Sequence, residues 1–103
     1  MEDISYMIKF YENEIKPQIE KGSYDEAKTN LIGLLAVLQI EQFTRELVGN
    51  LIEHLPSAIA STGSLIKYIE RNEIDLIKRC NKYLVADLKQ FKMRLEALTK
   101  SQS

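Results

Sequence analysis

The sequence is poor in the residues that build disulfide frameworks, metal centres and tight turns. Its 103 residues include one cysteine, one histidine, two prolines, four glycines and no tryptophan. A disulfide within the chain needs two cysteines, and a histidine-rich metal site needs several imidazoles, so both are excluded. The few turn-forming residues leave long stretches for regular structure, and the length suits one domain with its own core.

Motifs that carry catalytic chemistry are missing as well. The glycines Gly22, Gly33, Gly49 and Gly63 are isolated, so there is no glycine-rich phosphate loop, and no nucleophile elbow occurs. His54 alone cannot supply the two Glu-x-x-His motifs of di-iron bundles. We therefore expect a non-enzymatic protein that needs no cofactor, metal or small-molecule substrate.

Long hydrophobic runs and a large net charge are also lacking. The net charge is −1, and the chain is 45% hydrophobic and 28% charged, as is ordinary for a soluble domain. No uncharged run approaches the length of about 20 residues that a spanning helix needs; residues 29–40, for example, form a run of twelve. The acidic start Met1-Glu2-Asp3 lacks a signal-peptide pattern, and a lone cysteine fits a reducing compartment. We expect a cytoplasmic protein that does not enter a membrane.

Apolar residues recur instead at three- and four-residue steps, which is typical of helices. Turn signals at Gly22, at Pro56 and at Asn72 divide the chain. Ser23 with Glu26 predicts a capping box, and Asn72 predicts a helix cap. The expected helices span residues 3–21, 23–54, 57–71 and 73–100, with residues 61–64 open to a loop interpretation.

The buried faces of the first and last helices follow from this spacing. At 100° per residue, the apolar residues of the last helix share one arc of about 120°. They are Leu76, Ile77, Cys80, Leu84, Leu88, Phe91, Leu95 and Leu98. The first helix carries a similar stripe of Ile4, Ile8, Tyr11, Ile15 and Ile19, with Pro17 expected to kink it. Cys80 is expected to be a buried, inert thiol.

The pattern predicts an all-α fold, an antiparallel four-helix bundle built from two helical hairpins, each with a short and a long arm. Residues 19–28 align with residues 69–78, a period of 50 that is explained either by an internal repeat or by the similar needs of two hairpins. We assign residues 1–100 to the bundle domain and residues 101–103 to a disordered tail.

Residues 19–27 and the long helix after them resemble the hairpin turn of HEPN-type helical bundles and of tetratricopeptide units. HEPN ribonucleases carry an Arg and a His close together on one helix, whereas eight residues separate Arg45 from His54 here. The resemblance therefore implies a non-catalytic member, for example an inactive regulator in a toxin–antitoxin pair. From its own context, before Pro56, His54 is expected at the negative end of a helix dipole.

Two features point to protein binding. The second helix is apolar on opposite sides, with Leu31, Leu34 and Leu38 on one and Ile40, Phe43, Leu47 and Leu51 on the other. Such a helix is either central in the core or shared with a partner. Tyr6 and Phe10 lie one turn apart, off the isoleucine stripe of the first helix. We predict an interface at Tyr6, Phe10 and Phe43.

Charge is divided unevenly along the chain. Residues 1–64 hold five basic and ten acidic groups, and residues 65–103 hold nine basic and five acidic groups. Lys78, Lys82, Lys89 and Lys92 form a row on the last helix. This row is an ordinary solvated face, a surface for an acidic protein, or a weaker candidate for nucleic acid.

We expect a protein–protein interaction module, either a homodimer or an accessory subunit of a larger complex such as a nucleic-acid polymerase or an RNA-guided assembly. The alternatives are a nucleic-acid-binding bundle that uses the lysine row and the inactive HEPN-like regulator.

Overall fold

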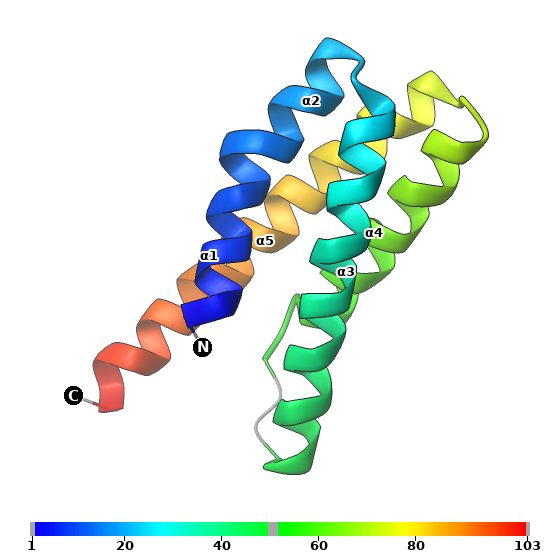
Figure 1. The fold of residues 1–103 in the computed structure, drawn as a ribbon. Helices are drawn as coiled ribbons and strands as arrows, with labels where there is room; N and C mark the ends of the chain where they lie inside the picture. Colours follow the sequence, from blue (N-terminus) through cyan, green and yellow to red (C-terminus); the bar gives the residue numbers. More distant parts are fainter. Residues whose placement is uncertain (1, 50–51, 103) are drawn as a thin grey trace.

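The structure is a computed structural model that describes residues 2–49 and 52–102. Its elements in order are α1 (Glu2–Phe10), the π-helical turn η1 (Tyr11–Ile15), α2 (Lys16–Lys21), α3 (Tyr24–Leu47), α4 (Leu55–Glu70) and α5 (Ile74–Gln102). Within the described residues every regular element is a helix, so the all-α prediction is confirmed. The N-terminal segment α1–η1–α2 runs as one continuous helical rod, so four helical units make up the molecule (Figure 1).

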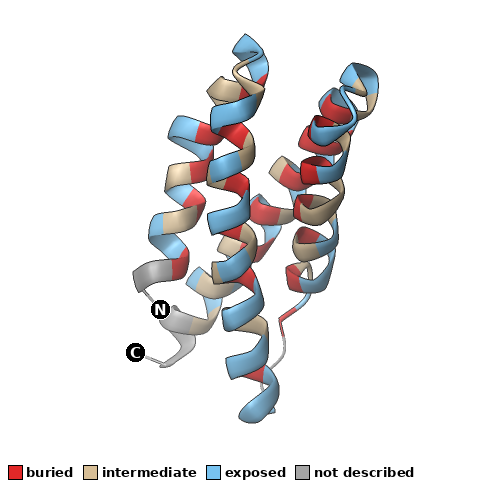
Figure 2. Ribbon diagram, turned by 45° about the vertical axis from the view of Figure 1, so that its right-hand side comes forward, coloured by how far each residue is buried: buried red, intermediate tan, exposed pale blue. Residues whose placement is uncertain are grey.

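The four units enclose one core. The N-terminal segment packs against α3 and α5, and α4 packs against the same two helices. Buried residues lie on the sides of the helices that face one another, and exposed residues lie along the outer sides (Figure 2). The predicted stripe Ile4, Ile8, Tyr11, Ile15 and Ile19 is wholly buried. From the predicted arc of α5, Ile77, Cys80, Leu84, Leu88 and Phe91 are buried, and Leu95 and Leu98 pack against the core from its edge.

The disturbance expected at Pro17 takes the form of the π-helical turn directly before it. Pro17 has no N–H group to donate to the carbonyl of Asn13, and its ring crowds that carbonyl. The pattern of backbone hydrogen bonds along the helix shifts as a result. The Lys16 N–H donates to the carbonyl of Tyr11, which lies five residues back instead of four. The shift inserts one extra residue and keeps Tyr11 and Ile15 on the buried side.

The turns after α2 and α4 have the same hydrogen bonds, displaced by 50 residues. The Gly22 N–H donates to the Ile19 carbonyl, and the Ser23 N–H to the Gln18 carbonyl, at 3.1 and 2.8 Å. The equivalent bonds run from Asn72 to Ile69 and from Glu73 to Tyr68, at 3.1 and 3.0 Å. Both are Schellman turns with a left-handed residue, Gly22 at φ 83° and Asn72 at φ 56°.

These turns correct two expectations about capping. Ser23 is the N-cap of α3 but makes no side-chain cap bond, so the predicted capping box with Glu26 is not formed. Asn72 is the left-handed residue after α4, not an N-cap, and it tolerates that conformation better than most residues do. The backbone bonds of the two turns instead satisfy the last carbonyl groups of α2 and α4.

The second helix is shorter than the predicted span of residues 23–54. It ends at Leu47, because Gly49 takes a left-handed φ of 66° and its N–H bonds back to the Glu46 carbonyl at 3.2 Å. His54 is left-handed as well and is the N-cap residue of α4, not the end of α3. The last turns of α3 extend past the start of α4, with only the connector beside them (Figure 1).

The remaining boundaries differ by smaller amounts. Residues 61–64, for which a loop was an alternative, lie inside α4, where the buried Thr62 hydroxyl donates to the Ala58 carbonyl at 2.7 Å. Helix α5 includes residues 101 and 102 of the predicted tail, and Ser103 lies outside the described residues.

Leu88→Ala is expected to destabilise the protein by about 2–5 kcal/mol, because a fully buried side chain is replaced by a cavity. Urea denaturation gives the free energy of unfolding. Met93→Ala, on the same helix but 53% exposed, serves as the control and should change that free energy by less than about 0.5 kcal/mol. If Leu88→Ala and Met93→Ala lowered the free energy of unfolding equally, the assigned buried face of α5 would be wrong.

The buried Tyr11 hydroxyl donates to Asn81 Oδ1 on α5. Tyr11→Phe leaves that acceptor unpaired, at an expected cost of about 1–3 kcal/mol near pH 8. Burial raises the pKa of the Tyr11 hydroxyl, so the fold favours its neutral form. The wild type should therefore lose stability as the pH rises above the ordinary tyrosine pKa of about 10.

Urea denaturation of both proteins from about pH 8 to about pH 11 tests this. The stability gap between wild type and Tyr11→Phe should narrow as the pH rises, because the variant has no hydroxyl to ionise at this position. Comparing the two proteins cancels the contribution of Cys80, whose thiol pKa is also raised by burial. A gap that stays constant with pH would contradict the prediction.

Candidate protein-interaction surface

Helix α3 carries an apolar stripe on the side that faces away from the core. Ile40, Phe43 and Leu47 are 65%, 62% and 71% exposed, while Leu31, Leu34 and Leu38 are fully buried. At 100° per residue the exposed side chains lie roughly opposite the buried ones. Helix α3 is therefore not a central helix with apolar residues covered all round, which was one of the two predicted alternatives.

Other members of this surface were missed by the sequence analysis. Ile32 is 51% exposed and Val48 is exposed beside the end of α3. Ile32, Ala36 and Ile40 are four residues apart, so they follow one line on the helix, and that spacing was visible in the sequence. We call Ile32, Ala36, Ile40, Phe43 and Leu47 the α3 stripe; Leu51 lies outside the described residues.

The three predicted interface residues are not equivalent. Tyr6 is 65% exposed, and its ring stacks on that of Phe10 with centroids 6.4 Å apart and an interplanar angle of 18°. Phe10 is half-buried and packs against the core, so less of its ring is available to a partner. Among the described residues, the Tyr6–Phe10 pair is the only contact between aromatic rings. The ring of Phe43 on α3 therefore contacts neither of the other two.

The predicted lysine row lies beside the N-terminal segment. Lys78, Lys82 and Lys89 are exposed, and Lys92 is half-buried. All four line hollows between the N-terminal segment and α5, together with Lys16 of α2. The contribution of Lys16 could not be seen in the sequence, because 61 residues separate it from Lys78.

A polar cluster joins the start of α4 to the middle of α5. The Ser57 and Ser61 hydroxyls donate to Asp87 Oδ2 at 2.8 and 3.4 Å, and His54 Nδ1 lies 3.9 Å from Asp87 Oδ1. The Asp87 carboxylate thus faces the positive end of the α4 dipole. The expectation that His54 would meet a negative helix end is wrong, because His54 precedes α4 and its nearest charge is Asp87.

The cluster contains the residue types of a Ser–His–Asp triad but joins them differently. In a triad the serine donates to the imidazole, and the imidazole donates to the carboxylate. Here the serine hydroxyls donate directly to the carboxylate. The cluster therefore ties α4 to α5 through side-chain hydrogen bonds.

Cys80 is buried, as predicted, and its thiol donates to the Ser61 carbonyl at 3.2 Å. Burial raises the pKa of this thiol, and the nearby Asp87 adds to the effect. A raised pKa lowers the fraction of reactive thiolate at neutral pH. The low reactivity of Cys80 remains a prediction.

Two other kinds of site were searched within the described residues. There, no group of three or more His, Cys, Asp or Glu side chains could hold a metal ion. In the same part of the chain, no helix combines the length and the apolar character needed to cross a membrane.

Comparison of the chain with protein-family models, with curated proteins and with solved structures finds no match. The α3 stripe and the lysine-lined hollows are two candidate binding surfaces of the molecule.

Asp87→Ala should destabilise the protein by about 1–3 kcal/mol, because two hydroxyl groups and the start of α4 lose a charged partner. A double-mutant cycle with Ser57→Ala, measured by urea denaturation, should give a coupling energy of at least about 0.5 kcal/mol. Gln90→Ala, at an exposed position of the same helix, is the control. Additive effects of the two mutations would contradict a direct interaction between Ser57 and Asp87.

Proposed function

We propose that this protein is a small, non-enzymatic protein–protein interaction module that binds through the α3 stripe. One observation carries the proposal: α3 buries one apolar side in its own core and exposes a second apolar side to solvent. Monomeric proteins rarely expose more than a few hundred Å² of contiguous apolar surface. The stripe is the kind of surface that a partner covers.

The energy available from the stripe supports this role. Burying a large apolar side chain completely is worth about 1.5–3 kcal/mol, so a side chain that is about two-thirds exposed still offers about 1–2 kcal/mol. Ile32, Ile40, Phe43 and Leu47 together offer about 4–8 kcal/mol on one protomer, and twice as much in a symmetric pair. Association costs about 4–15 kcal/mol. The stripe supplies enough to sustain a contact with further support at its rim.

Two occupants fit the proposal: a second copy of the chain, or a larger protein for which this chain is an accessory subunit. In a symmetric homodimer the stripe would meet itself, and this is the simplest way to cover a self-complementary apolar surface. Tyr6, which is exposed beside Phe10 on the neighbouring α1, is an aromatic anchor of the kind that interfaces favour.

The proposal includes a finer description of the fold and its setting. We take the bundle as two antiparallel hairpins, one from the N-terminal segment and α3 and the other from α4 and α5. The matching Schellman turns, 50 residues apart, support this interpretation. A cytoplasmic location is supported by the lone, buried cysteine, which needs no oxidising compartment.

Size-exclusion chromatography with light scattering tests the role of the stripe. We expect the wild type to run as a dimer at about 100 μM and Phe43→Glu and Leu47→Glu to run as monomers, because each buries a charge in the contact. Both positions are exposed in the monomer, so the melting temperature of the isolated chain should barely change. Gln90→Glu, at an exposed position of α5, should leave the dimer intact.

A monomeric wild type would exclude the second copy as occupant and leave the larger partner. Affinity purification then decides, with the wild type and Phe43→Glu as paired baits. Proteins retained by the wild type and by Gln90→Glu but lost with Phe43→Glu would support the proposal. Identical sets of proteins with all three baits would overturn it.

A further inference from the structure

Two adjoining hollows form a groove between the N-terminal segment and α5, on a surface separate from the α3 stripe. One hollow, of about 540 Å³, lies beside Tyr11, Leu88 and Met93, and the other, of about 490 Å³, lies beside Ile19 and Asn81. Lys16 and Val85 line both hollows, so the two lie next to each other. Sites of this size accept ligand groups or side chains of a partner.

The walls of the groove are rich in lysine. Lys16 comes from α2, and Lys78, Lys82, Lys89 and Lys92 come from α5. Within the described residues none of these five ammonium groups lies within 4.0 Å of a carboxylate. Lysines that line a concave surface without ion-pair partners focus positive potential there.

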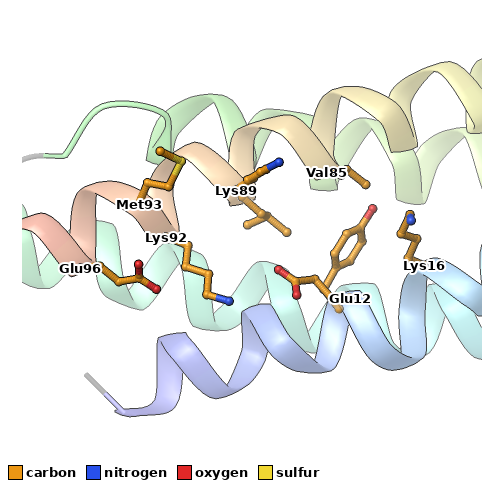
Figure 3. Close-up of a pocket in the computed structure, with 9 residues that line it drawn as sticks. Glu12, Lys16, Val85, Lys89, Lys92, Met93 and Glu96 are labelled. Carbon is orange, nitrogen blue, oxygen red and sulfur yellow. The ribbon is translucent and has the colours of Figure 1, made fainter.

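Acidic residues in the groove are fewer and sit mainly on the opposite side. Glu12 and Glu20 belong to the N-terminal segment, and Glu96 lies at the distal end of the α5 wall. Figure 3 shows Lys92 extending from α5 toward Glu12 and Lys16 rising from the other side of the space. The α5 wall is therefore the side toward which the acidic groups of a ligand would turn.

An apolar strip accompanies the lysines along the α5 wall. Val85 is half-buried where the two hollows meet, and Met93 is 53% exposed beside Leu88. The lysines from position 78 to position 92 span 14 residues of helix, or about 21 Å at a rise of 1.5 Å per residue. A ligand that matches the whole groove has an apolar side, an acidic side and a length of about four helical turns.

We propose that this groove binds an acidic amphipathic helix of a partner protein. The apolar residues of that helix would cover Val85 and Met93, and its carboxylates would face the lysines of α5 and Lys16. A nucleic acid matches less well, because its phosphates would pass Glu12, Glu20 and Glu96 and its backbone offers nothing to the apolar strip. This surface is additional to the α3 stripe and does not depend on it.

The probe is a fluorescein-labelled synthetic helix of about 18 residues, with glutamates along one side and leucines along the other, and binding is followed by fluorescence anisotropy in about 0.15 M salt. We expect binding that weakens at least about tenfold for a peptide of the same composition whose residues are shuffled to remove the two sides. Lys82→Glu/Lys89→Glu should weaken binding of the original peptide by at least about tenfold.

The matched control is Lys67→Glu/Arg71→Glu, which makes the same charge change at exposed positions of α4 and the following turn. It should alter the affinity by less than about twofold. Met93→Glu tests the apolar strip and should weaken binding, whereas Phe43→Glu on the α3 stripe should leave binding unchanged. Circular dichroism of each variant confirms that the helices remain folded.

Three results would overturn the proposal. Equal binding of the ordered and shuffled peptides, or equal losses in the two double variants, would show nonspecific charge attraction. Tighter binding of an 18-nucleotide single-stranded DNA, lost in Lys82→Glu/Lys89→Glu, would assign the groove to nucleic acid. If Phe43→Glu weakened peptide binding as much as Lys82→Glu/Lys89→Glu does, the peptide would not bind in the groove alone.

Discussion

The structure depends on burial of one narrow apolar stripe from each of its four helical units. Four helices around a single core can cover only the side of each helix that faces inward, so every other apolar residue stays in solvent. The N-terminal segment and α4 use their apolar stripes almost completely in this way. Helix α3 does not, because it has two apolar sides and the fold provides partners for one of them. The exposed stripe is thus a direct consequence of a bundle with one core.

The same constraint explains which parts of the fold could be predicted. Helical periodicity is a local property, so the isoleucine stripe and the arc centred on Leu84 were assigned correctly from sequence. The end of α3 was missed because a glycine occurs both inside helices and as the left-handed residue that follows them, and the sequence around Gly49 does not decide between the two; the left-handed His54 is uncommon for its residue type. The turn at Asn72 was found, but its role was not, since asparagine suits both an N-cap and a left-handed position.

The candidate surfaces were predictable only in part, for a related reason. The sequence showed that α3 has two apolar sides, but only its neighbours in space decide which side is covered. The lysine row was visible at helical spacing, whereas Lys16, which completes the groove, comes from the first helical unit. The Asp87 cluster was missed because its members are up to 33 residues apart, and no local pattern joins His54 to Asp87.

The arrangement of the helices also determines how the two surfaces relate. Helix α3 packs against the N-terminal segment and α4, and α5 packs against the same two neighbours, so α3 and α5 lie diagonally across the core. The outward side of α3 therefore faces away from the groove that α5 forms with the N-terminal segment. A partner on the α3 stripe would leave the groove accessible. If both proposed surfaces bind their partners, the bundle would join two proteins at once, by an apolar contact on one side and a charged, amphipathic contact on the other. A small core is enough for such a role, because each binding surface needs only one helix face that the neighbouring helices hold rigid.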